Sequence, residues 1–378
     1  MRTILLSSGL GHVRRGVEIW MVEMLGHWPS HWGEVELWSG GHVPELEQDK
    51  RYHQVANLSR DNFLFRSQSW GKRYELEQLS FLPGVLLKLK LKRADVVYCG
   101  DPVLTWHLKR FQGWHGASVV FMNGMRLGSA WANHFDGVHL LTDPYLEQTR
   151  EELGDSLRAH FFVAPHFTDI NVFRPADAAM RLKARQHFAL PEDAFLVLTV
   201  GPIGNVSGKR LDFLAQEIAR LDERVHLVHA GGEEDGGPAI REDVKRLLGK
   251  RIHFLGPVER KFMPLLYQAS QVYSLAALAE PFSIAIIEAL ATGLPVVHHA
   301  DPITCWVSGS GGRHVSMTNP GEAASAISDL LEKPTEYEQV RKEARKWAED
   351  RYSPENISDR IARELDNIRR QNLDRHKN

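Results

Sequence analysis

Short runs of β-branched and aliphatic residues alternate along the chain with longer segments in which apolar residues recur at helical spacing. This alternation predicts parallel β-sheets whose strands are joined by crossover helices. The runs are nearly continuous in apolar residues, which is typical of strands buried on both faces. The predicted strands span 2–8, 34–39, 95–99, 118–122, 138–142 and 160–164 in the first half, and 195–200, 225–230, 252–256, 272–276 and 295–299 in the second.

Two such series of strands predict two doubly wound, Rossmann-like α/β domains. Strand periodicity stops at residues 165–180, so the domains are expected to span 1–172 and 173–354. The last stretch has one apolar face, formed by Ile357, Ile361, Leu365 and Ile368. It predicts a helix over about 355–378 that packs back on the first domain. Because doubly wound sheets bind ligands beyond the carboxyl ends of their strands, we expect a site in a cleft where the two sheets face one another.

Composition restricts the classes of function. The 378 residues carry a formal net charge of −2, which argues against nucleic acid as a main partner because phosphate backbones attract strongly basic surfaces. Cys99 and Cys305 form no CxxC pair and the 19 histidines lack ligand-like spacing, so no metal site is expected. The first nine residues resemble a strand more than a signal peptide, and no apolar run approaches the roughly 18 residues of a membrane span. We therefore expect a cytoplasmic protein.

The most informative segment spans residues 279–297. Ser283 is a residue that caps helices, the following positions have helical periodicity, and Gly293 ends the pattern. The free N–H groups at the start of such a helix form a binding site for an anion such as a diphosphate. Glu280 stands just before this helix and can reach a sugar hydroxyl, and Glu288 lies just over one turn inside it and can hold a ribose diol. The alternative is that both are surface carboxylates near a helix start.

A candidate cation precedes this segment. Lys209 follows a glycine-punctuated turn after the predicted strand that ends before Gly201. From there it can reach the same sheet edge and neutralise phosphate charge, with Arg210 as a possible helper. The alternative interpretation of Lys209 is an exposed lysine near a helix start.

The segment EPFSIAIIEALATGLPVV (280–297) resembles the Glu-x7-Glu signature of family 4 glycosyltransferases, which have the GT-B fold. Other pieces follow in the family's order. PHFTDINVFRP (165–175) resembles its interdomain segment, and RRGVEIWMVEML (14–25) resembles its first glycine loop and helix. The resemblance covers most of the chain and is most specific over 195–312.

This resemblance implies a role for each matching residue. It implies that Glu280 lies near the transferred sugar, that Lys209 binds phosphate and that Glu288 binds the ribose. It also implies that a bound metal is not required and that the anomeric configuration is retained; the chain has no DxD aspartate pair. The donor-binding positions that it implies are Gly16, Arg15, Gly201, Lys209, Arg210, Gly256, Val258, Glu280, Phe282, Ser283, Ile284 and Glu288.

Three positions depart from the family pattern. Pro202 stands where the family usually has an arginine, Asn123 stands where it has a histidine, and Arg15 replaces the first glycine of the first-domain loop. Arg210, Arg15 or Arg14 can supply the missing cation. Asn123 can form hydrogen bonds to a hydroxyl but cannot take a proton, so we interpret it as a residue that positions the acceptor.

These observations predict a retaining glycosyltransferase in which Glu280, Lys209 and Asn123 carry the catalysis. The expected donor is a nucleotide diphosphate sugar, with no other cofactor, and the acceptor is an unidentified glycan, lipid or small molecule. Two alternatives stay open: a nucleotide-sugar 2-epimerase, and a non-catalytic nucleotide-binding partner subunit.

The basic, leucine-rich stretch 83–93 could contact a membrane surface, but an amphipathic helix that leads into the next strand is the favoured interpretation. We interpret Trp70 and Trp131 as core or helix-packing residues, and stacking against a sugar ring is the alternative.

Overall fold

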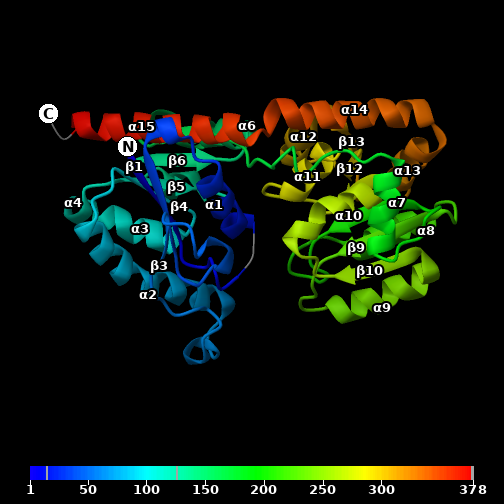
Figure 1. Cartoon of the computed structure of the whole chain (residues 1–378), viewed down its shortest axis with the longest axis horizontal. Coiled ribbons are helices and arrows are strands. Elements are labelled where there is room, and N and C mark those ends of the chain that lie inside the picture. The colour runs from blue at the N-terminus through cyan, green and yellow to red at the C-terminus, as the bar shows by residue number, and fades with distance from the viewer. Residues whose placement is uncertain (14–15, 125–126, 376–378) are drawn as a thin grey trace. The chain divides into compact units, whose positions relative to one another are not determined.

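The computed structural model describes residues 1–13, 16–124 and 127–375 (Figure 1). By its internal contacts the chain divides into two compact units. The first unit comprises residues 1–166 and 354–378, and the second comprises residues 167–353. This boundary lies a few residues before position 172, where the sequence pattern places the end of the first domain.

Within its described residues, the first unit is built on a parallel sheet of seven strands. In sheet order these are β3 (Tyr52–Gln54), β2 (Glu34–Ser39), β1 (Arg2–Ser7), β4 (Val96–Cys99), β5 (Ser118–Met122), β6 (Gly137–Leu140) and β7 (His160–Val163). The helices are α1 (Gly16–Gly26), α2 (Trp70–Leu91), α3 (Pro102–Arg110), α4 (Gln112–His115), α5 (Ser129–Ala132), α6 (Asp143–Leu153) and α15 (Pro354–Arg375). The central strands are buried on both faces, as their continuous apolar sequence predicts.

Helix α15 belongs to the first unit although it follows the second unit in sequence. Ile361, Leu365 and Ile368 on its apolar face are buried. Gly137 at the start of β6 permits this close approach, because a Cβ there would lie 2.2 Å from the Cδ1 atom of Ile368. Near the end of the helix, the Asn372 side chain donates a hydrogen bond of 2.9 Å to the hydroxyl of Ser118 on β5.

The described residues of the second unit form a parallel sheet of six strands. In sheet order these are β10 (Ile252–Gly256), β9 (Val225–Ala230), β8 (Phe195–Val200), β11 (Val272–Leu275), β12 (Val296–His299) and β13 (Gly312–Val315). The helices are α7 (Ala178–His187), α8 (Leu211–Ala219), α9 (Gly237–Leu248), α10 (Met263–Ala269), α11 (Ile284–Ala291), α12 (Pro302–Ser308), α13 (Glu322–Glu332) and α14 (Pro334–Arg351). The two sheets confirm the prediction of two doubly wound α/β domains.

The order of strands in each sheet reverses direction at one position. In the first unit the reversal falls between β1 and β4, and in the second it falls between β8 and β11. The loops that leave neighbouring strands at such a position run to opposite sides and open a crevice beyond the carboxyl ends of the strands. The fold therefore places a candidate site in the second unit where β8 and β11 end.

The structure differs from the predicted elements at the sheet edges and in one helix. The edge strands β3 and β13 were not predicted, because they are only three and four residues long and lack a continuous apolar run. Helix α2 begins at Trp70, inside a stretch that shows no clear periodicity, and continues through Pro83. The Ser69 side chain caps its start by accepting a hydrogen bond from the Lys72 N–H.

Candidate active site

Lys209 and Glu280 meet at the reversal point of the second unit's sheet. Lys209 comes from the loop after β8, and Glu280 comes from the loop after β11. The Lys209 ammonium donates a hydrogen bond of 2.6 Å to Glu280, and the two side chains are 21% and 13% exposed. Two residues that are 71 positions apart, and that could each have been an unrelated surface charge, therefore form one partly buried ion pair.

Gly201 makes room for the Lys209 side chain. It follows β8 directly and has a φ of 145°, a conformation that favours glycine. A Cβ at this position would lie 3.1 Å from both Cγ and Cε of Lys209. The lysine stem therefore crosses the face of the glycine, which directs the ammonium towards Glu280.

Helix α11 begins beside this pair. Its N-cap Ser283 is buried and accepts a hydrogen bond from the Ile286 N–H, as the sequence pattern predicts. Phe282 is buried and Ile284 is the first helical residue. The first N–H groups of a helix have no partner within the helix and carry partial positive charge. An ammonium and a helix N-terminus at the same strand end provide complementary charge for a diphosphate.

Glu288 lies one turn further along α11 and is 3% exposed. Its carboxylate forms an ion pair with Arg260, and the Tyr267 hydroxyl donates a hydrogen bond of 2.8 Å to its other oxygen. Burial, followed by the neighbouring Glu288 charge, raises the pKa of Tyr267 well above its usual value, so Tyr267 stays a donor. Sequence reasoning did not identify Arg260 or Tyr267, because nothing in their local pattern shows which side chain they contact.

Tyr273 on β11 connects the two glutamates electrostatically. It is fully buried, and burial raises the pKa of its hydroxyl. The charges of Glu280 and Glu288 raise this pKa further. Both carboxylates therefore lie near enough to Tyr273 to act on the same buried hydroxyl.

Three further predicted donor-binding residues lie in loops or at a strand end of the second unit. Arg210 has a left-handed backbone and its guanidinium donates to the carbonyl oxygens of Met317 (2.7 Å) and Ala276 (3.3 Å). Its charge thus holds the segments that follow β11 and β13. Gly256 ends β10 with a φ of 67°, and Val258 is half-buried in the loop that follows.

The remaining predicted residues lie in the first unit. Gly16 is exposed at the first position of α1, and Arg15 lies outside the described residues. Asn123 follows β5 and is buried. Its amide group donates to the Leu127 carbonyl (2.9 Å) and accepts from the Leu127 N–H (2.8 Å), so it closes the loop that it begins. A role of Asn123 towards an acceptor stays a prediction.

A buried polar cluster that sequence reasoning missed lies where β1 and β4 end. Asp101 accepts hydrogen bonds from the Ser8 N–H (2.6 Å) and the Tyr74 hydroxyl (2.9 Å). Burial raises the pKa of Asp101, against these two hydrogen bonds, which favour the carboxylate. Arg60 lies over the Tyr74 ring at 4.5 Å and pairs with the fully buried Glu77. The one available signal was an aspartate two residues after the end of the predicted strand 95–99.

The two tryptophans interpreted as core residues have different surroundings. Trp70 is 48% exposed at the start of α2, whereas the Trp131 ring contacts the rings of Phe121 and Phe135.

Among the described residues, no group of three or more His, Cys, Asp or Glu side chains is placed to hold a metal ion. In the same part of the chain, no helix combines the length and the apolar character needed to cross a bilayer.

Comparison with known sequences gives a match in the second unit. Residues 180–347 match the family model described as Glycosyl transferases group 1. D-inositol 3-phosphate glycosyltransferase of Xylanimonas cellulosilytica is 32% identical over 169 residues, which are 41% of this chain and 40% of that protein. The chain thus aligns with about 40% of the length of this relative.

Comparison with solved structures extends over both units. Sucrose-phosphate synthase from Thermosynechococcus elongatus has a TM-score of 0.79 at 18% identity, covering 97% of this chain and 98% of that one. Anabaena HepE in complex with UDP has a TM-score of 0.76 at 18% identity, covering 97% and 99%. Another structure of HepE holds UDP-glucose. The comparisons confirm the predicted GT-B fold, and they show that the second unit carries a domain similar to Glycosyl transferases group 1, which supports the prediction of a glycosyltransferase.

Proposed function

We propose that the protein is a retaining glycosyltransferase that moves a sugar from a nucleotide diphosphate sugar to a hydroxyl acceptor. The observation that carries this proposal is the ion pair of Lys209 and Glu280 beside the N-terminus of α11, where β8 and β11 end. Carboxyl ends of strands at a reversal point are where doubly wound folds bind nucleotides. The match of residues 180–347 to Glycosyl transferases group 1 supports the same assignment.

In this proposal the second unit stabilises the leaving diphosphate. Charge builds up on the diphosphate as its bond to the sugar C1 breaks, and the Lys209 ammonium and the first amides of α11 stabilise that charge. Glu280 orients the sugar through a hydroxyl, and Glu288, held by Tyr267, binds the ribose. The acceptor oxygen forms its bond to C1 on the same face, and its proton passes to the leaving phosphate oxygen.

We assign acceptor recognition to the first unit, with Asn123 as the positioning residue. The acceptor is a glycan, a lipid or a small molecule. Because HepE binds UDP and UDP-glucose, uridine nucleotides are the first donors to test. Metal independence, the cytoplasmic location and membership of family 4 are parts of the proposal that rest on the resemblance and on composition.

The donor is tested first by thermal shift. A ligand that binds only the folded state raises the melting temperature, so the preferred nucleotide diphosphate gives the largest shift. We expect Lys209→Ala and Glu280→Gln to fold normally and to lower transfer about a hundredfold or more, the magnitude seen when one stabilising donor is removed. Lys245→Ala is the control, because Lys245 is an exposed cation on α9 that pairs with Glu242. Near-normal transfer in both active-site variants would refute the proposal.

The same assay separates the two alternative functions. A 2-epimerase converts the donor in the absence of any acceptor, which product analysis by NMR detects. A non-catalytic partner subunit binds the nucleotide and shows no turnover with any acceptor. Retention is tested with an anomerically pure donor, because a product of inverted configuration excludes the mechanism proposed here.

A further inference from the structure

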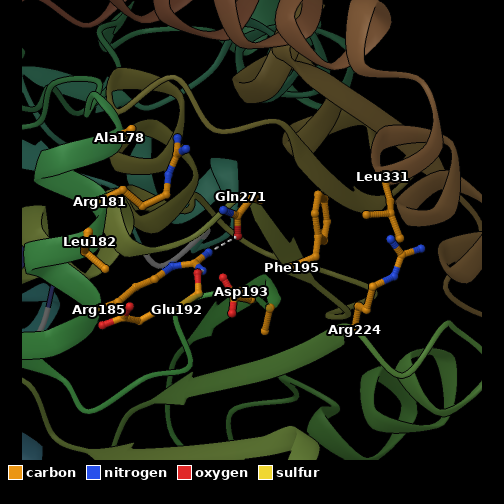
Figure 2. Close-up of a pocket in the computed structure, with 11 residues that line it drawn as sticks. Ala178, Arg181, Leu182, Arg185, Glu192, Asp193, Phe195, Arg224, Gln271 and Leu331 are labelled. Carbon is orange, nitrogen blue, oxygen red and sulfur yellow. Dashed lines mark hydrogen bonds between the residues drawn. The ribbon is translucent and has the colours of Figure 1, made fainter.

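A pocket lies at the opposite end of the second unit's sheet from the candidate active site. It has a volume of about 380 Å³, which is large enough for a small organic ligand. Its wall includes the residues at or just before the amino ends of β8, β9 and β11, among them Phe195, Arg224 and Gln271 (Figure 2). Helix α7 forms another wall, with Arg181, Leu182 and Arg185 facing the pocket.

Arg185 forms the fixed part of this pocket. It is 3% exposed, and its guanidinium donates to the Ala269 carbonyl (3.0 Å) and to the Gln271 side chain (2.8 Å; dashed in Figure 2). Burial and the positive charge of Arg181 lower the pKa of Arg185, and the nearby charges of Asp193 and Glu192 oppose that shift. The two acidic residues therefore partly offset the positive charge around Arg185.

Arg181 differs from Arg185 because one of its donors has no partner. It is half-buried, and its Nε atom is buried without a hydrogen-bond partner. Within the described residues Arg181 forms no ion pair. A buried donor without a partner costs free energy, which an anion in the pocket would recover.

Arg224 supplies a second cation on the other side of the Phe195 ring (Figure 2). It pairs with Asp222 at 2.9 Å, but the two side chains are 68% and 48% exposed. Ion pairs this exposed contribute little stability, so Arg224 can turn to a ligand at small cost. The pocket wall contains three arginines and two acidic residues, and Asp222, which pairs with Arg224, lies outside it.

The remaining wall is apolar. Phe195 and Leu331 present half-buried side chains, and Leu182 is 39% exposed at the rim. An inorganic ion would leave this surface in contact with water, whereas a ligand with an apolar body would cover it. We propose that this pocket binds a small organic anion, a phosphate monoester or a carboxylate that carries an apolar or aromatic group.

This site is distinct from the candidate active site and does not rest on the proposed function. Strand β8 separates them, because Phe195 begins the strand and Gly201 follows its last residue. At about 3.3 Å per residue, the two ends lie roughly 20 Å apart. Lys209, which marks the active site, therefore serves as a control for location.

The test uses isothermal titration of the full chain with phenyl phosphate, inorganic phosphate and benzyl alcohol. We expect saturable binding of phenyl phosphate, about tenfold tighter than that of inorganic phosphate, and no binding of the neutral alcohol. Arg181→Gln should weaken the affinity for phenyl phosphate about tenfold. Leu182→Glu should abolish binding, because it places a negative charge at the rim while replacing an exposed side chain.

Two controls decide where the probe binds. Arg246→Gln removes an exposed arginine of α9 that lies outside the pocket wall, and it should leave the affinity unchanged. Lys209→Ala should also leave it unchanged. The proposal is overturned if phenyl phosphate shows no saturable binding, if Arg181→Gln and Leu182→Glu bind it like the wild type, or if Lys209→Ala abolishes binding.

Discussion

Replacing Gly201 with alanine tests whether the Lys209 side chain is positioned by the backbone beneath it. Gly201 has a φ of 145°, a conformation that costs a residue with a Cβ about 1–3 kcal/mol. The new methyl would lie 3.1 Å from Cγ and Cε of Lys209 and 3.3 Å from Cδ, where carbon atoms prefer about 3.5–4.0 Å. The flexible lysine stem has to move by a few tenths of an ångström along its length, which displaces the ammonium from its 2.6 Å contact with Glu280.

We therefore expect Gly201→Ala to lower the free energy of unfolding by about 1–3 kcal/mol and to weaken the binding of pyrophosphate about tenfold. Urea unfolding measures the first effect, and isothermal titration with pyrophosphate measures the second. Gly249→Ala is the matched control. Gly249 also has a positive φ of 55°, but nothing lies within 4 Å of its added Cβ, so this variant should lose stability without losing pyrophosphate affinity.

A double-mutant cycle isolates the contact between the two side chains. In a Lys209→Ala background the atoms that the new methyl would meet are absent, so Gly201→Ala should cost less stability than in the wild type. Strict additivity of the two substitutions, or a folded Gly201→Ala protein with wild-type pyrophosphate affinity, would show that the lysine is not positioned by Gly201.

Three further predictions concern other parts of the two units. Tyr267→Phe removes the donor to buried Glu288, so urea unfolding should show a loss of about 1–3 kcal/mol, and an unchanged midpoint would contradict the assigned hydrogen bond. Gly137→Val should detach α15 because the new side chain overlaps Ile368, which limited proteolysis detects as early loss of the C-terminal helix; wild-type resistance would argue against this contact. Burial lowers the pKa of His139 to about 4, so below pH 6.5 the unfolded chain takes up the proton first, and this one group lowers the free energy of unfolding by about 1.4 kcal/mol for each pH unit down to about pH 4. His139→Gln should therefore reduce the pH slope of stability, measured by urea unfolding, by about that amount.

Much of the fold could be predicted because strands buried on both faces have a strong sequence pattern. Ile4, Leu5 and Leu6 in β1 show this pattern without interruption, and they are fully buried. The edge strands β7 and β10 still contain apolar runs and were predicted. The edge strands β3 and β13 are three and four residues long and consist largely of polar residues, so they could not be distinguished from loops.

The candidate site could be predicted where its chemistry is local in sequence. Glu280, Ser283 and Glu288 lie within nine residues. Because Ser283 marks the start of a helix, the positions of the two glutamates relative to that start can be read from the sequence. Asn123 shows the limit of such reasoning. Its residue type indicated hydrogen bonding to an acceptor, but the structure shows that both ends of its amide group already bond to the backbone of Leu127.

What the sequence could not show is which partners hold these groups in place. Glu288 is one turn from a helix start, where an exposed carboxylate would be unremarkable. It is buried instead because Arg260 and Tyr267 reach it from a different loop and helix, 28 and 21 residues away. A buried carboxylate with two donors is costly to leave unpaired, so this arrangement keeps Glu288 in one position. A ribose diol that takes the place of Arg260 or Tyr267 would donate hydrogen bonds to the carboxylate in the same way. Whether Glu288 can bind a nucleotide therefore depends on how readily these two partners give up their contacts with it.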